Sequence, residues 1–528
     1  MLILKRDIFY ALAVSLLALG PAAVQAEVAP VASPSITPQS PAQPQSNSIT
    51  DALVEAAGKL NPQATDIEKS ESDALVAFYQ KRGSPLWIAN AAITDGARAL
   101  ARELSSAMAY GLDPKAFIVP DLASGVPSDP KLLAEFDVTI NRAALAYARH
   151  ARGGRIASPA QMLNSNLDRK PQLIAPAIVL DTLAQSTEPD AALRGFHPKH
   201  PQFERLRQAY LKALPAEGAA KPLNAAAKKL RANMEMWRWM WDDLGPLHVF
   251  NNIPEFMQYV YMDGQVIRSE KIVVGMLDKQ SSVFSRPLKY VVLRPKWRVP
   301  ESIMVREVWP SLLRGGGLMR QYGLEVETKN GEPRNWRTID WAKDDIRNYN
   351  VTQAPGPNSS LGYVKFSFPS QHTIFMHDTP DKWMFKSTRR TLSHGCLRVQ
   401  KPMQLAEIIL REDKGWDAAK VAMMSRAGPL NNEIAIDKNI PIHLAYFTAW
   451  VDDDGRLKAF SDIYGHEKRV TQALDGAWAK INKGRDHLAP VQPNFNPATV
   501  AQSKPAASAG RKDASVSEMI NNAMGISF

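Results

Sequence analysis

The spacing of apolar residues changes midway along the chain, and this change limits the possible folds more than any other feature. Before about residue 235 apolar residues recur at helical spacing, as at Leu133, Phe136 and Ile140. After it, the runs 256–262 and 265–274 are β-rich and flank an Asp-Gly pair, which predicts a hairpin. The predicted fold class is therefore α+β, with an all-α region followed by a β-rich region.

A chain of 528 residues is long enough for two or three domains. The composition predicts a signal peptide at 1–26, a Pro-rich disordered linker at 27–50, a helical scaffold domain at 51–235, a β-rich domain at 236–475 and a linker-like tail at 476–528. Residues from about 301 to 361 interrupt the strand pattern with glycine- and proline-rich turns. So long an insertion in a compact domain is more typical of a lid or binding flap than of an inert loop.

The N-terminus has the layout of a secretory signal peptide. Lys5 and Arg6 precede an apolar run, Ile8 to Leu19, and small residues follow as far as Ala26. An uncleaved anchor helix is the alternative, although the run is short for a membrane span. The net charge of +11 suits an anionic partner, and an exported chain without a recognised nucleic-acid-binding motif is not expected to bind nucleic acid.

Cys396 is the only cysteine, so an internal disulfide is excluded. Its neighbour Gly395 lacks a Cβ atom, which lets backbone N–H groups approach a substrate oxygen closely. His377, at the end of a predicted strand, is a candidate base for the thiol proton. Arg398 shares a strand face with Cys396 and is a candidate carboxylate clamp. Together these residues predict a nucleophilic site.

Two other interpretations of this segment stay open. His372, His377, His394 and Cys396 are also of metal-ligand type, but no C-x₂-C pair accompanies them. The odd offset between His372 and His377 would also point their side chains to opposite faces of a strand. We therefore expect neither a metal nor a cofactor. The remaining alternative is a buried, inert cysteine.

At these residues the sequence resembles the L,D-transpeptidases with a YkuD-type catalytic domain, whose signature is a His followed, after a spacer, by Ser/Thr-His-Gly-Cys. It is most similar to the large periplasmic YcbB-type branch. The segments that carry this similarity are Asn233 to Trp239, Asn252 to Pro254, Lys365-Phe366, His377 to Pro380, Tyr446 to Trp450 and Asp462 to Tyr464.

The resemblance implies a cysteine-dependent peptidoglycan L,D-transpeptidase of the periplasm, without a cofactor and with no membrane span after cleavage. Its partners would be a tetrapeptide stem as acyl donor and diaminopimelate as acceptor, giving a 3→3 cross-link with release of D-Ala. It implies that Cys396 is the nucleophile, His377 the base and His394 a supporting proton carrier, with the N–H groups of Gly395 and Cys396 as oxyanion donors. It also implies a carbapenem target. Substrate-binding or supporting roles fall to Arg398, Ser393 and Arg390.

Three alternatives to cross-linking are consistent with the sequence. The same thioester chemistry suits attachment of an outer-membrane protein to the stem peptide. Water in place of the acceptor would make the protein a cysteine peptidase, and a wall-binding scaffold would need no chemistry. The chain also departs from the YcbB-type branch, because the stretch between Leu214 and Asn233 is too short for the usual peptidoglycan-binding module.

Overall fold

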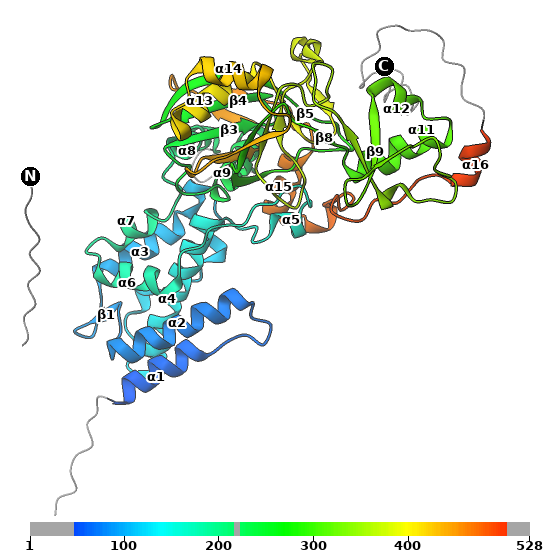
Figure 1. The fold of residues 1–528 in the computed structure, drawn as a ribbon. Helices are drawn as coiled ribbons and strands as arrows, with labels where there is room; N and C mark the ends of the chain where they lie inside the picture. The colour runs from blue at the N-terminus through cyan, green and yellow to red at the C-terminus, as the bar shows by residue number, and fades with distance from the viewer. Residues whose placement is uncertain (1–46, 216–221, 504–528) are drawn as a thin grey trace, which may run out of the picture. The chain divides into compact units, whose positions relative to one another are not determined.

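The computed structural model describes residues 47–215 and 222–503 (Figure 1). The predicted signal peptide and most of the predicted Pro-rich linker lie outside these residues. From Ser48 onward the described residues belong to one compact unit. Helices come first and a large sheet follows, which confirms the α+β fold class. Within 47–215 and 222–503, no helix is both long and apolar enough to cross a membrane.

Local sequence signals set the starts of the first helices. α2 (Asp66–Arg82) follows Thr65, and the Thr65 and Glu68 side chains each accept a hydrogen bond from the other residue's N–H. α4 (Pro130–Gly153) follows Asp129, with a proline in its first turn. The other helices of this region are α1 (Asn47–Gly58), α3 (Asp95–Ser105), α5 (Pro159–Met162), α6 (Pro176–Gln185) and α7 (Pro189–Arg194), with 3₁₀ turns η1 (Ala107–Tyr110), η2 (Pro114–Ala116) and η3 (Leu122–Ser124).

A fully buried carboxylate, Asp137, lies in the core of this region. Asp137 of α4 accepts hydrogen bonds from the Tyr79 hydroxyl at 2.6 Å and from the N–H groups of Leu86 and Trp87 at 3.0 and 2.7 Å. Because a buried carboxylate is costly unless it is hydrogen-bonded, these contacts fix α2 and the following turn against α4.

The prediction that this region is all-α is wrong at one place. A hairpin of two-residue strands, β1 (Ile88–Ala89) and β2 (Ala92–Ile93), lies between α2 and α3. Its turn residues Asn90 and Ala91 have φ angles of 51° and 56°, the left-handed values that a tight hairpin turn requires. Alanine rarely adopts this conformation, so the sequence gives no signal for the turn.

The second half of the chain is built on a sheet with the strand order β16-β7-β12-β13-β15-β5-β4-β3-β17-β6, and β14 pairs with β5. The predicted hairpin at Asp263-Gly264 is confirmed as β4 and β5, with φ angles of 49° and 78° in the turn. The strands are β3 (Leu247–Asn252), β4 (Met257–Met262), β5 (Gln265–Gly275), β6 (Phe284–Pro287), β7 (Tyr290–Leu293), β12 (Val364–Ser367), β13 (Met376–His377), β14 (Thr391–Ser393), β15 (Leu397–Val399), β16 (Asn432–Ala435) and β17 (Pro441–Ala445).

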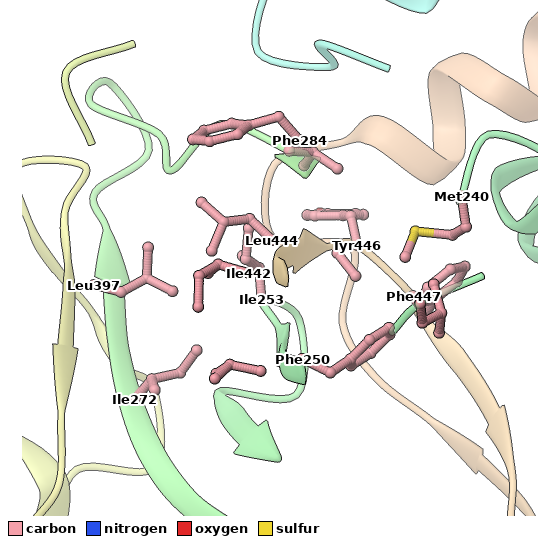
Figure 2. Close-up of a cluster of buried hydrophobic side chains, with 14 of the residues drawn as sticks. Met240, Phe250, Ile253, Ile272, Phe284, Leu397, Ile442, Leu444, Tyr446 and Phe447 are labelled. Carbon is pink, nitrogen blue, oxygen red and sulfur yellow. The ribbon is translucent and has the colours of Figure 1, made fainter. Parts of the chain in front are cut away.

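One apolar core joins this sheet to two helices that the sequence places in the scaffold domain. Ile272, Leu397 and Leu444 from three strands lie in a cluster that also includes Phe250 and Phe447 (Figure 2). The same core takes the apolar faces of α8 (Pro201–Ala213) and α9 (Ala225–Arg238). The core of the sheet therefore begins ahead of the predicted domain boundary at residue 235. Helical spacing predicts an apolar face but does not say which element that face packs against.

The segment predicted as a lid has its own sheet and its own apolar core. Val299, Val305, Trp309, Val326 and Val351 belong to this core. The strands, in the order β10-β9-β11-β8, are β8 (Trp297–Arg298), β9 (Leu324–Thr328), β10 (Pro333–Arg334) and β11 (Tyr349–Gln353). The helical turns are α10 (Glu301–Ile303), a π-helix η4 (Met304–Val308), α11 (Trp309–Leu313), α12 (Gly317–Tyr322) and η5 (Ile346–Asn348).

The described part of the predicted tail makes specific contacts with the rest of the fold. His487 contacts the Ser165 hydroxyl at 2.9 Å, and the Phe495 ring lies 5.4 Å from the Trp309 ring of the insertion. The start of the predicted linker-like tail is therefore packed against the fold. The remaining elements are η6 (Lys382–Lys386), α13 (Pro402–Lys414), α14 (Ala418–Ala427), β18 (Ala449–Val451), β19 (Leu457–Ala459), α15 (His466–Leu474), η7 (Trp478–Lys480) and α16 (Pro497–Gln502).

Asn233 of α9 connects this helix to the turn between β17 and β18. Its side-chain oxygen accepts hydrogen bonds from the N–H groups of Thr448 and Ala449 at 2.9 and 3.1 Å. Its amide nitrogen donates to the Lys229 carbonyl and the Thr448 hydroxyl at 2.8 and 3.0 Å. Asn233 is fully buried, so all four hydrogen-bonding positions of its amide are satisfied inside the protein.

We expect Asn233→Ala to lower the free energy of unfolding by about 3 kcal/mol, because two buried N–H groups lose their acceptor. The urea midpoint followed by tryptophan fluorescence measures this loss. Gln208→Ala, on the exposed side of α8, is the matched control and should change little. An Asn233→Ala midpoint equal to that of the control would contradict the structural role of this amide.

Candidate active site

Three charged or titratable side chains form a row across neighbouring strands. His377 of β13 pairs directly with Lys365 of β12 and with Arg398 of β15. Side chains at paired positions lie on the same face of a sheet. The alternate residues Phe366, Met376 and Leu397 belong to the apolar core, so the row lies on the opposite face from that core.

Cys396 lies in the loop between β14 and β15, two residues before Arg398. The Ser393 hydroxyl donates to the Cys396 carbonyl at 2.6 Å and accepts from the Gly395 N–H at 3.2 Å, which closes the turn. The Ser281 hydroxyl donates to the Gly395 carbonyl at 2.6 Å. The turn is thus fixed from inside and from a neighbouring loop.

Gly395 is required by the shape of this turn. Its φ angle is +112°, which a residue with a side chain rarely adopts, and a Cβ atom would lie 3.4 Å from the Gln280 carbonyl. The Gly395 N–H already donates to Ser393, whereas the Cys396 N–H has no acceptor among residues 47–215 and 222–503. Of the two amides predicted as oxyanion donors, the described chain therefore leaves the Cys396 N–H available.

The tautomer of His377 follows from its backbone partner. Nδ1 of His377 contacts the Asp378 carbonyl, which can only accept, so Nδ1 carries the proton. Nε2 is then left with a lone pair and can take a proton from another group. Burial, followed by the charge of Arg398, lowers the pKa of His377 to about 3, although the hydrogen bond to Asp378 partly opposes this. The imidazole is therefore neutral at pH 7.

The thiol is also neutral at rest. Burial raises the pKa of Cys396 to about 11, although a backbone hydrogen bond at Phe375 and the charges of Lys365 and Arg398 act in the other direction. Its Sγ atom lies 3.9 Å from the Thr373 carbonyl. Since the thiolate is the nucleophile, this environment holds the sulfur in its unreactive form until a proton acceptor or a nearby positive charge acts on it.

His394 has a partner that the sequence does not indicate. Its Nε2 atom lies 3.0 Å from Oε1 of Glu307, which belongs to the π-helix of the insertion. Lys279 contacts the same oxygen at 2.7 Å. Burial alone would raise the pKa of Glu307, but the hydrogen bond and charge of His394, together with Lys279, lower it to about 2. No motif predicts this contact, because 87 positions separate the two residues.

Arg398 is already paired in the structure. One of its terminal nitrogens contacts Asp381 at 3.3 Å and the Met384 sulfur, and the side chain is buried. A substrate carboxylate would therefore have to share this guanidinium with Asp381.

Arg390 supports the backbone rather than presenting a free guanidinium. Its nitrogens donate to the carbonyls of Ile272, Ser387 and Phe256 at 3.1, 2.9 and 3.1 Å. The buried hydroxyl of Ser393 is likewise used within the nucleophile turn. Of the predicted substrate-binding residues, both Arg390 and Ser393 therefore have their polar groups occupied by the protein itself.

The third member of this row is the cation Lys365, for which the sequence predicts no catalytic role. Its Nζ atom lies 4.7 Å from the centre of the Phe375 ring, and that ring stands edge-on to His377 at 5.5 Å. Burial lowers the pKa of Lys365, while Glu433 and Cys396 oppose this. Strand alternation past Phe366 could have placed Lys365 beside His377, had the pairing of β12 with β13 been known.

His372 belongs to a separate buried cluster. Its Nε2 atom contacts Asp168 at 3.0 Å, and its Nδ1 atom contacts Nε2 of His487 at 2.7 Å. The metal interpretation would need His372, His377, His394 and Cys396 together. In the described ranges no group of three or more His, Cys, Asp or Glu side chains is placed to hold a metal ion.

Comparison with known proteins agrees with this geometry. Residues 246–421, which include β3 to β15 and the nucleophile turn, match the family model of an L,D-transpeptidase catalytic domain. The chain contains an L,D-transpeptidase catalytic domain. Residues 73–209, ahead of this L,D-transpeptidase domain, match a family model described as a scaffold domain.

One relative supports the assignment of the L,D-transpeptidase domain. A Haemophilus influenzae protein named "Putative L,D-transpeptidase" is 32% identical over 227 residues. The match covers 43% of this chain and 45% of that protein, so the chain spans less than half the length of this relative.

The raised pKa of Cys396 predicts how the rate of its reaction with iodoacetamide depends on pH. Since the pKa is raised to about 11, the thiolate fraction should rise about tenfold per pH unit between pH 7 and pH 10. Intact-mass measurements give the alkylation rate directly, because the chain has one cysteine. Cys396→Ser supplies the blank. A rate that is already constant from pH 7 upward would show a stable thiolate and contradict this prediction.

Proposed function

We propose that the protein is a peptidoglycan L,D-transpeptidase that forms 3→3 cross-links through a thioester on Cys396. The observation that carries this proposal is the neutral His377, with Nε2 unprotonated, paired across the sheet with Arg398, which follows the single cysteine of a matched catalytic domain by two residues. The acyl donor would be a tetrapeptide stem, and its terminal D-Ala would be released.

In the donor half of the reaction, Nε2 of His377 takes the proton from the Cys396 thiol as the sulfur attacks the carbonyl carbon of the third stem residue. A C–S bond forms, and the Cys396 N–H is available to stabilise the oxyanion. The C–N bond to D-Ala then breaks, and the imidazolium of His377 returns the proton to the leaving amine. The positive Lys365 and Arg398 would favour the transient negative charge on sulfur.

In the acceptor half, the side-chain amine of diaminopimelate on a second stem attacks the thioester carbonyl. A C–N bond forms, the C–S bond breaks, and the proton lost by the nitrogen neutralises the departing Cys396 thiolate. Water or the amine of an outer-membrane protein could take the acceptor's place by the same chemistry. Each acceptor leaves a different product: a stem dimer, a shortened stem or a protein joined to the stem.

We further propose that the protein acts in the periplasm and belongs to the YcbB-type branch. The apolar run before Ala26 and the matched scaffold domain ahead of the catalytic domain support this assignment. The basic net charge of +11 would favour contact with anionic wall polymers.

Incubation of the protein with disaccharide-tetrapeptide, followed by mass spectrometry, tests the proposed function. We expect dimers with the mass of two reactants minus one free D-Ala, and none with Cys396→Ala, because the thioester cannot form. Shortened monomers without dimers would indicate a peptidase instead. Release of D-Ala without dimers, together with stem peptide joined by an amide bond to an added envelope protein, would indicate attachment of a protein.

Carbapenems test the nucleophile independently of the acceptor. Attack of Cys396 on the β-lactam carbonyl should add one carbapenem mass to the wild-type chain and nothing to Cys396→Ala. His377→Gln should slow this acylation by about 100-fold, because the thiol loses its base. Lys289→Met, on an exposed side chain, serves as the control. An unmodified wild-type mass after prolonged exposure would count against an activated thiol.

A further inference from the structure

The two histidines predicted to act with Cys396 present opposite ring nitrogens. His377 carries its proton on Nδ1, because Nδ1 faces the Asp378 carbonyl, and so has its lone pair on Nε2. His394 faces the ionised Glu307 through Nε2 at 3.0 Å, so that Nε2 carries the proton and the lone pair is on Nδ1. Nδ1 of His394 has no hydrogen-bonding partner in the described parts of the chain. It is also absent from the buried polar atoms, so it is open to a ligand or to solvent.

Their electrostatic surroundings also differ. His377 lies between the cations Lys365 and Arg398, which disfavour a lasting positive charge on its ring. His394 faces the carboxylate of Glu307, and Lys279 contacts the same carboxylate oxygen as the opposing charge. Titratable groups held in contrasting environments are a usual sign of separate acid–base tasks.

We infer that the Glu307–His394 pair is the base for the acceptor half of the reaction, while His377 serves the donor half. This inference rests on the proposed function. The acceptor amine arrives as an ammonium and first loses one proton to solvent. As its nitrogen attacks the thioester and the C–N bond forms, Nδ1 of His394 takes the second proton. The C–S bond breaks, and the proton returns through solvent to the Cys396 thiolate.

Glu307 acts in this step as a positioning residue, because it touches His394 and not the substrate. It belongs to a π-helix, an insertion of backbone that often marks functional sites. Its side chain is only 16% exposed, and it enters the site from the segment predicted to be a lid. The insertion would therefore complete the acceptor-side base when it lies against the nucleophile turn.

Separate measurement of the two half-reactions tests this inference on the full chain. A disaccharide-tetrapeptide with an acetylated diaminopimelate amine can donate but cannot accept, so D-Ala release and intact mass report the acyl-enzyme. A stem peptide with a free amine is then added, and the transfer rate is measured against its concentration. Glu307→Gln keeps the shape of the side chain and removes its charge, and Glu301→Gln is the matched control on an exposed residue of the same insertion.

We expect Glu307→Gln to leave acyl-enzyme formation within about twofold of wild type and to lower the maximal transfer rate by about tenfold or more, with the acceptor KM little changed. His394→Gln should give the same pattern, and the double variant should lose no more than either single variant, because both act through one imidazole. Glu301→Gln should leave both half-reactions unchanged.

Two results would overturn the inference. Equal losses in both half-reactions would show that Glu307 only supports the fold of the turn, and unchanged transfer would show that another group accepts the proton. The absence of D-Ala release by the wild-type chain would refute the proposed function itself, and the inference with it.

Discussion

Three fully buried polar side chains on α9 hold the helices and the sheet together. Asn233 binds the turn after β17, and Glu235 accepts hydrogen bonds from the N–H groups of Arg155 and Ile156 at 2.6 and 3.1 Å. Arg238 donates to the carbonyls of Ala151 and Tyr110. Because a buried polar group without a partner costs more free energy than one hydrogen bond returns, these contacts allow few alternative arrangements. The network therefore fixes α9 against the helical region on one side and the turn after β17 on the other.

The chemistry of the site depends on which partner each buried group meets. The thiol and the imidazole of His377 are both neutral because burial disfavours their charged forms, and two cations on the same sheet face oppose the resulting high pKa of the thiol. Ser393, Gly395 and Arg390 hold the turn in shape. The site therefore combines a turn held by hydrogen bonds with a thiol that is neutral at pH 7.

Sequence patterns predicted the site residues better than their surroundings. The single cysteine, the upstream His377 and Gly395 were predicted as site residues from their chemistry and spacing in the sequence. Glu307 and Lys279 could not be predicted, because the contacts of Glu307 with Lys279 and with His394 join three segments that are far apart in the sequence. Likewise, the sequence did not indicate whether Arg390 binds substrate or supports the site, and in the structure its nitrogens donate to three backbone carbonyls.

The sequence by itself determined the α+β class, the hairpin at Asp263-Gly264 and the nucleophile turn, since each depends on local periodicity or on the backbone freedom of one glycine. Only the tertiary structure decided that α8 and α9 share the core of the sheet, that Lys365 faces His377 and that the insertion supplies the partner of His394. These features depend on strand pairing and on contacts between distant segments. The physical reason is that local sequence sets the shape of an element, whereas burial and hydrogen-bond satisfaction across the whole fold set its neighbours.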